Sequence, residues 1–257
     1  MISRMFRIAS LILLASFALS SAAGAGTCSN ASLRGTYGFL HDGTDSNGAP
    51  ATAAVTQITF DPTTGTFTGE TTTSHEGAIA TESLNGTYTI APDCTGTGTP
   101  SGGSPFSIVV TSKGFLAVHP FSEGFAVKQD SQTCTNAAVV GTFGFETTGL
   151  FLEGAPSTGW VAFIGKLKLT VNRSGEGIIS GRAAGSEGDT ALAFAPVTGS
   201  YSVASDCTGT ATITPKGQSP LNFSFVVVDC GNEILAIETD LDTVVSGTWV
   251  KNGDEQW

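Results

Sequence analysis

Three histidines are the side chains of this sequence best suited to metal binding or to acid–base chemistry. They are His41, His75 and His119, and no two of them have a metal-ligand spacing such as H-x-H. Only the folding of the chain can bring them together. We therefore expect separate surface histidines and no metal site.

The acidic residues suggest two further chemistries, calcium binding and glycoside hydrolysis. The segment 42–48, DGTDSNG, lacks the D-x-D-x-D-G spacing and the terminal glutamate of a calcium loop, so a hairpin turn is the better interpretation. Glu70, Glu76 and Glu82 could supply a carboxylate pair, but any acidic chain offers such pairs. H-E-x-x-H, G-x-S-x-G and phosphate-loop patterns do not occur. We therefore assign no catalytic and no cofactor-binding residue.

The chain contains the same unit twice. Residues 28–39 (CSNASLRGTYGF) match residues 134–145 (CTNAAVVGTFGF) without a gap, and the string DCTGT occurs once in each half. Near the ends of the units, GFAVK pairs with GTWVK, and the offset has grown from 106 to 123. The common order indicates a tandem duplication in which the second copy has longer loops. We expect repeat 1 at residues 26–130 and repeat 2 at residues 131–257.

Four of the five cysteines follow the duplication. Cys28 is equivalent to Cys134 and Cys94 to Cys207, so the pairing that respects the repeat is Cys28–Cys94 and Cys134–Cys207. Position-matched pairs in an exported chain favour disulfides over a metal site. Cys230 has no counterpart; a link between two chains and a rival partner for Cys207 are alternatives, and we expect a thiol buried at the end of a strand.

The N-terminus has the three parts of a secretory signal. Arg4 and Arg7 precede an apolar run at 8–19, and A-G-A at 23–25 forms a small-residue cleavage site. We expect cleavage after Ala25 and a secreted or periplasmic mature chain. The apolar run is shorter than the ~20 residues that span a bilayer. No later segment is long and apolar enough, so we expect no integral membrane segment in the mature chain.

The mature chain is acidic. Loss of the signal changes the formal charge from −11 to −13, because Arg4 and Arg7 are removed. This charge argues against nucleic acid and anionic membranes as partners, since both bind basic protein faces. With 13% charged and 40% hydrophobic residues, the composition is typical of an exported β-protein and not of a disordered chain.

Short alternating segments predict β-strands throughout both units. Apolar side chains alternate with polar ones in residues 161–171 and again in residues 221–227. Turn signals separate such segments, and they are Asp42-Gly43, Asn47-Gly48, Asp61-Pro62, Asn85-Gly86 and Asn252-Gly253. Sequential hairpins predict an all-β fold made by tandem duplication of a small antiparallel β-barrel, with two β-sandwiches as the alternative.

The strings GSY, DCTGT, LAIETD and VVSGT between Gly199 and Thr248 resemble a group of uncharacterised secreted bacterial proteins rich in Gly and Thr. Those proteins are regarded as calycin-like, or similar to the allene oxide cyclase barrel. The resemblance implies a calycin-like barrel in each unit. The allene oxide cyclase and dirigent relatives of that barrel bind apolar ligands inside it, and none of their catalytic residues maps onto this chain.

Three hypotheses about function follow. The leading one is an exported, non-enzymatic protein of two calycin-like barrels, able to hold a small apolar ligand in at least one of them. It draws on the aromatic residues Phe39, Phe106, Phe163, Phe223 and Phe225. The second is a structural or adhesive surface module, in which duplication provides length or avidity. The third is a cyclase or isomerase with its pocket in repeat 1, where the three histidines lie.

Overall fold

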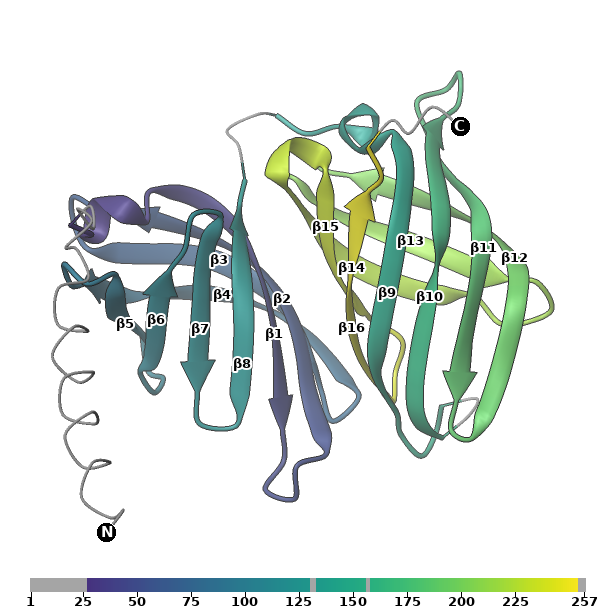
Figure 1. The fold of residues 1–257 in the computed structure, drawn as a ribbon, viewed down its shortest axis with the longest axis horizontal. Helices are drawn as coiled ribbons and strands as arrows, with labels where there is room; N and C mark the ends of the chain where they lie inside the picture. The colour runs from purple at the N-terminus through teal and green to yellow at the C-terminus, as the bar shows by residue number, and fades with distance from the viewer. Residues whose placement is uncertain (1–26, 130–132, 156–157, 254–257) are drawn as a thin grey trace, which may run out of the picture.

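The computed structural model of the chain describes residues 27–129, 133–155 and 158–253, and it contains two closed antiparallel barrels (Figure 1). Each barrel has eight strands in sequence order, and the first strand pairs with the last. The prediction of an all-β fold with tandem barrels is confirmed, and the sandwich alternative is wrong. The expected signal segment 1–25 and the expected junction at 130/131 lie outside the described residues.

The strands of each barrel follow a short 3-10 helix. Barrel 1 contains η1 (Asn30–Ser32), β1 (Gly35–Thr44), β2 (Pro50–Asp61), β3 (Thr66–His75), β4 (Ala78–Ile90), β5 (Thr95–Pro100), β6 (Phe106–Val110), β7 (Gly114–His119) and β8 (Ser122–Lys128). Barrel 2 contains η2 (Asn136–Val139), β9 (Gly141–Phe151), β10 (Gly159–Val171), β11 (Gly177–Glu187), β12 (Thr190–Val203), β13 (Thr208–Pro215), β14 (Leu221–Val228), η3 (Asp229–Gly231), β15 (Glu233–Glu238) and β16 (Thr243–Lys251). No helix in this part of the chain has the length and hydrophobicity to cross a bilayer.

One end of each barrel is closed by its 3-10 helix. In barrel 1 the Tyr88 hydroxyl donates to the carbonyl oxygens of Asn30 and Leu33, both at 3.0 Å. Barrel 2 repeats the device, since the Tyr201 hydroxyl donates to the Asn136 carbonyl at 2.9 Å. A buried tyrosine whose hydroxyl is hydrogen-bonded closes a barrel without an orphaned polar atom. The 3-10 helix and the tyrosine therefore close the same end in both barrels.

Two disulfides join the pairs that the repeat predicts. They are Cys28–Cys94 and Cys134–Cys207, each with a Cα–Cα distance of 4.9 Å. Two disulfides indicate an oxidising compartment. The expectation for Cys230 is wrong in one respect: its side chain is exposed, because the chain leaves the sheet after β14 and forms η3 there.

The predicted alternation holds in β10 but not in β14. In β10, Leu167 and Leu169 are buried while Lys168 between them is exposed. In β14 both faces are buried, because Phe223 points into barrel 2 and Val226 packs on barrel 1. A strand that is covered on both faces has a continuous apolar run instead of strict alternation.

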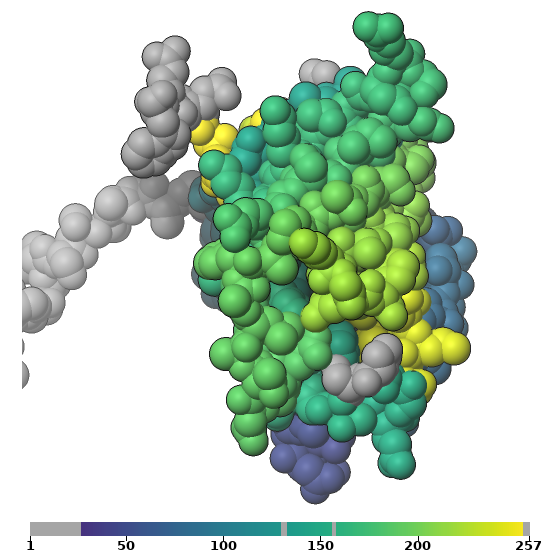
Figure 2. All heavy atoms as spheres, turned by 90° about the vertical axis from the view of Figure 1, so that its right-hand side faces the viewer, coloured from purple at the N-terminus to yellow at the C-terminus, as the bar shows by residue number. Residues whose placement is uncertain are grey.

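The outer faces of two strand groups form the contact between the barrels. Barrel 1 contributes β1, β2, β3 and β8, and barrel 2 contributes β14, β15 and β16. Figure 2 views the molecule from the side of barrel 2, whose green residues face the viewer while blue residues of barrel 1 lie behind them. Gly38 lets the backbones approach, since a Cβ there would lie 2.5 Å from Cγ1 of Val228. The buried apolar residues of the contact are Leu40, Ala53, Val55, Val127, Val226, Val228, Leu235, Ile237 and Val244.

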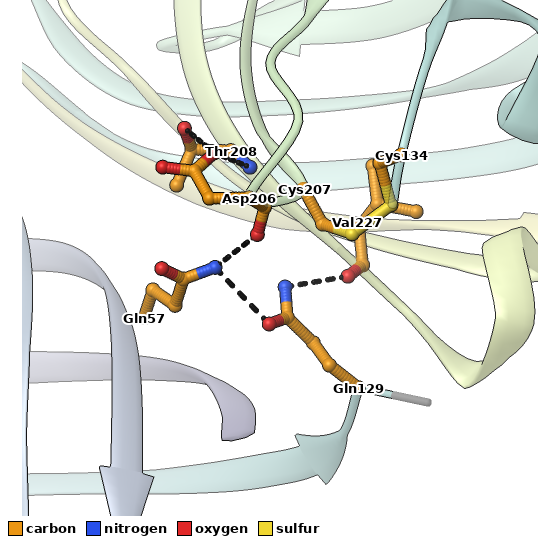
Figure 3. The surroundings of a disulfide bond; sticks show 7 residues. All are labelled: Gln57, Gln129, Cys134, Asp206, Cys207, Thr208 and Val227. Carbon is orange, nitrogen blue, oxygen red and sulfur yellow. Dashed lines mark hydrogen bonds between the residues drawn. A yellow bond between two sulfur atoms is a disulfide. The ribbon is translucent and has the colours of Figure 1, made fainter. Parts of the chain in front are cut away.

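Two glutamine side chains connect the barrels next to this apolar contact (Figure 3). Gln57 of β2 donates to the carbonyl oxygen of Asp206 and, at 3.1 Å, to Oε1 of Gln129. Gln129 in turn donates to the Val227 carbonyl at 2.9 Å. The paired amides satisfy backbone carbonyls at the border of the interface, where unpaired polar atoms would cost about 1–3 kcal/mol each.

Two of the five turn signals lie inside strands. Asp42-Gly43 belongs to β1, where the register shifts between Gly43 and Thr44, and Asn85-Gly86 belongs to β4. Gly86 is opposite Phe67, and a Cβ there would lie 2.4 Å from Cζ of that ring. This glycine therefore makes room for an aromatic neighbour and does not form a turn.

Candidate functional site

Barrel 1 encloses a cavity of about 350 Å³. It extends to the end of the barrel where β7 turns into β8, opposite the end that η1 closes. The wall is mainly apolar, with side chains from several strands: Phe39, Ile58, Leu84, Phe106, Phe115 and Ala117. A cavity of this size and character is at the lower end of the range for small-molecule sites.

The floor of the cavity is aromatic. The rings of Phe39 and Phe115 lie 5.5 Å apart, and Phe115 also packs edge-on against Phe60 at 5.5 Å. Phe39 and Phe115 are both neighbours of Ala126 in the sheet. Because Ala126 presents only a methyl group, both rings have room to pack towards the closed end.

Hydroxyl groups form a polar strip on one wall. Thr56 of β2 donates to Thr71 of β3 at 2.8 Å, and the Thr71 hydroxyl lies 3.5 Å from that of Thr73. All three threonines line the cavity. The strip offers hydrogen bonds to a ligand without introducing a charge.

His41 brings the strongest polar feature of the cavity. It follows Tyr37 and Phe39 along the inward face of β1, and its ring centroid lies 5.1 Å from that of Phe39. Its Nδ1 is enclosed and has no hydrogen-bond partner among the described residues. Burial lowers the pKa of His41 to about 4, so the imidazole is neutral at neutral pH. At this nitrogen a neutral imidazole can either donate one hydrogen bond to a ligand or accept one from it, depending on the tautomer.

The expectation of scattered histidines is wrong, because all three lie at the same mouth. A hollow of about 300 Å³ at the mouth is lined by His41, His75 and His119. His75 Nδ1 is 2.9 Å from the Thr52 hydroxyl, and His119 Nδ1 is 2.9 Å from the Pro120 carbonyl oxygen. Within the described residues no group of three or more His, Cys, Asp or Glu side chains is arranged to hold a metal ion. His75 is thus hydrogen-bonded to a hydroxyl group, and His119 to a backbone carbonyl oxygen.

The acidic candidates lie outside the cavity. Asp45 closes the hairpin between β1 and β2, since its Oδ1 accepts from the backbone N–H groups of Asn47 and Ala49 at 2.8 and 2.9 Å. This confirms the hairpin interpretation of segment 42–48. Glu70 and Glu82 belong to β3 and β4, and Glu76 lies in the turn between these strands at the mouth. None of these three glutamates lines the cavity of barrel 1.

Two equivalent positions of barrel 2 carry larger side chains. Trp249 takes the place of Ala126 and packs against Phe223 and Phe225 at 6.1 and 6.0 Å. Phe163 takes the place of Ala54, because each is the β-sheet partner of the equivalent residue on the first strand. Trp249 thus occupies the central part of barrel 2, and Phe163 occupies the half of barrel 2 that corresponds to the hollow half of barrel 1.

Sequence reasoning missed Glu238, a carboxyl group buried in barrel 2. It is 1% exposed, and its Oε1 has no hydrogen-bond partner in the described part of the chain. Burial raises its pKa to about 8, and the nearby Asp240 and Glu187 add to the increase. In the repeat, Glu238 is equivalent to His119. The only signal in the sequence was a charged residue at the end of the apolar run of β15.

Comparisons with known proteins assign no family. No family model matches the chain, and no curated protein matches it. A solved structure from Nostoc punctiforme, a protein of unknown function from the DUF3598 family, aligns over 86% of this chain and 97% of its own length. At 7% identity and a TM-score of 0.24, the likeness identifies neither a family nor a function.

Proposed function

We propose that the protein is an exported, non-enzymatic carrier that holds one small, uncharged, mainly apolar molecule in barrel 1. The observation that carries the proposal is the apolar cavity of about 350 Å³ with the unpartnered Nδ1 of His41 at its wall. Two disulfides and the N-terminal signal pattern support export. The calycin-like resemblance of the sequence supports a ligand inside the barrel.

The size of the cavity limits the ligand. At a packing density of about 0.6 to 0.75, a volume of about 350 Å³ holds roughly a dozen non-hydrogen atoms. A chain alcohol such as decanol, a monoterpenoid alcohol or a substituted phenol has this size. For such ligands we expect a dissociation constant in the micromolar range, about −8 kcal/mol.

The charge of the ligand follows from the residues around the cavity. Neither the cavity nor the hollow at its mouth is lined by a Lys or an Arg, whereas Glu123 lines the cavity. A carboxylate placed inside would be buried without a cationic partner, which is costly. A hydroxyl or carbonyl group can instead bond to His41 or to the threonine strip, so these are the expected head groups.

Calorimetric titration of the full chain with decanol tests the proposal. We expect one site per chain and a dissociation constant that rises at least about tenfold in Ala117→Leu, because the larger side chain fills part of the cavity. Leu116→Ala is a matched control, since Leu116 is the neighbouring residue and points outwards. Absence of binding in the wild type, or equal binding by Ala117→Leu, would show that the cavity is not a ligand site.

A further inference from the structure

The interface between the two barrels has an uncovered equivalent on each barrel. The apolar part of the internal contact joins the β1–β2–β8 face of barrel 1 to the β14–β15–β16 face of barrel 2. Because the barrels are repeats, the β6–β7–β8 face of barrel 1 is equivalent to the β14–β15–β16 face of barrel 2. In the same way, the β10–β9–β16 face of barrel 2 is equivalent to the β1–β2–β8 face of barrel 1. We call these two surfaces the distal face of barrel 1 and the distal face of barrel 2.

The distal face of barrel 1 is apolar and exposed. The repeat makes Val109, Leu116, Val118 and Phe121 equivalent to Val226, Leu235, Ile237 and Val244 of the internal interface. The first four are 46%, 51%, 54% and 70% exposed, whereas the interface residues are at most 2% exposed. In Figure 1, β6 and β7 lie on the side of barrel 1 that barrel 2 does not cover. Clustered exposed apolar residues of this kind mark an interaction surface.

The distal face of barrel 2 carries the matching apolar residues. Glu146 is equivalent to Leu40, and their strand partners are Ile164 and Val55. Val250 is equivalent to Val127, since both are strand partners of equivalent glycines. Ile164 is 56% and Val250 is 51% exposed, whereas Val55 and Val127 are buried. This face therefore keeps part of the apolar surface that barrel 1 uses in the internal contact.

The distal face of barrel 2 differs in two polar residues from the face that barrel 1 uses in the internal contact, and one of them favours association of two chains. Lys166 takes the place of Gln57, which donates to the carbonyl oxygen of Asp206. The equivalent of Asp206 is Asp93, so Lys166 would meet a carbonyl oxygen and a carboxylate of opposite charge on the distal face of barrel 1. Glu146 in place of Leu40 acts against the contact, because its carboxylate would approach apolar side chains.

We propose that the chain self-associates head to tail: the distal face of barrel 1 in one copy docks on the distal face of barrel 2 in a second copy. The new contact repeats the geometry of the internal interface. Such a contact is heterologous, so it forms an open string of barrels or a closed ring, not an isologous dimer. Glu146 makes the association weaker than the internal contact and sensitive to a single substitution.

Sedimentation velocity of the full mature chain tests the proposal at about 0.15 M salt. The expected average mass exceeds one chain and rises with protein concentration. Val118→Glu and Ile164→Glu should each raise the dissociation constant at least about tenfold, because each places a carboxylate in the apolar contact. Glu146→Leu should lower it about tenfold, because it restores the apolar residue of the internal interface. Phe194→Glu is the control, since Phe194 is 55% exposed and lies on β12, outside both faces.

A mixing experiment separates this arrangement from any symmetric dimer. Val118→Glu keeps an intact distal face on barrel 2, and Ile164→Glu keeps one on barrel 1. At concentrations between the dissociation constants of the wild type and of the variants, we therefore expect each variant alone to remain single chains, and an equimolar mixture to form dimers with one copy of each. A single-chain mass for both the wild type and Glu146→Leu at every concentration would overturn the proposal. So would association that Phe194→Glu disrupts while Val118→Glu and Ile164→Glu leave it unchanged.

Discussion

Ala126 of barrel 1 and Trp249 of barrel 2 occupy equivalent positions on the last strand of their barrels. Ala126 is the sheet partner of Phe39 and Phe115, and Trp249 is the partner of the equivalent Phe145 and Ile234. The indole occupies the centre of barrel 2, whereas the methyl group leaves space for two phenyl rings in barrel 1. The same fold thus yields one barrel with a cavity and one whose centre is filled.

Two alanines at one repeat position test this difference in packing. Ala117 lines the cavity, and its equivalent Ala236 is fully buried in the core of barrel 2. We expect Ala117→Leu to raise the free energy of unfolding by about 0.5–1.5 kcal/mol, because it fills empty space. Ala236→Leu should lower it by about 1–3 kcal/mol through overpacking. Urea unfolding of both variants measures the difference, and equal destabilisation would contradict the contrast between the barrels.

The head group of the ligand should decide its affinity. At about pH 8, where unperturbed imidazoles are neutral, decanol should bind at least about tenfold more tightly than decanoate. His41→Leu should weaken decanol binding about tenfold by removing one hydrogen bond from the enclosed wall, with little effect on decane. His75→Leu serves as the control, because His75 lies at the mouth. Equal affinity for decanol and decanoate would refute the uncharged head group and leave the carrier proposal standing.

Glu238 should make the protein less stable as pH rises. Its pKa in the folded protein is about 8, against an ordinary value of 4.5, so the folded state holds a proton that the unfolded state has released. The contribution of Glu238 to the free energy of unfolding therefore falls by about 4–5 kcal/mol between about pH 4.5 and pH 8, and it does not change further above pH 8. Glu238→Gln should remove this slope, and the exposed Glu82→Gln should retain it. Urea unfolding across this range measures both, and parallel curves for Glu238→Gln and the wild type would contradict the assignment.

The disulfides should contribute similar amounts to stability. They close loops with separations of 66 and 73 residues, for which the chain-entropy model gives about 4 kcal/mol each. Replacing Cys28 and Cys94 together by alanine should lower the free energy of unfolding by that order, and the Cys134/Cys207 pair should behave alike. Denaturant unfolding gives the energies. A loss below about 1 kcal/mol for either pair would speak against the corresponding bridge.

Much of the fold was predictable because the duplication constrains it. Two matched copies specify equivalent cysteines, and sequential hairpins with period-two alternation lead to closed barrels. The sequence patterns gave wrong predictions where the burial of a strand depends on residues that are distant in the sequence. Val226 lies on the outer face of β14 and is buried only because barrel 1 covers it, whereas its equivalent Val109 is exposed. A sequence pattern around one strand carries no information about a second domain.

The candidate site was less predictable than the fold. His41, His75 and His119 belong to β1, β3 and β7, and only closure of the barrel brings those strand ends to one mouth. The cavity depends on a difference of side-chain volume at Ala126 and Ala54, which a hydrophobicity pattern treats as equivalent to Trp249 and Phe163. Glu238 was missed because nothing local distinguishes a buried carboxyl group from a strand-terminal surface glutamate.

The most direct test of the carrier proposal is a crystal structure of the full chain with a bromine-tagged decanol, located by the anomalous signal of bromine. The proposal predicts one bromine site inside barrel 1, between the walls that hold Phe39 and Phe106, with the hydroxyl group near His41 or the threonine strip. Bromine in barrel 2, on the outer surface alone, or absent at saturating ligand would contradict the proposal.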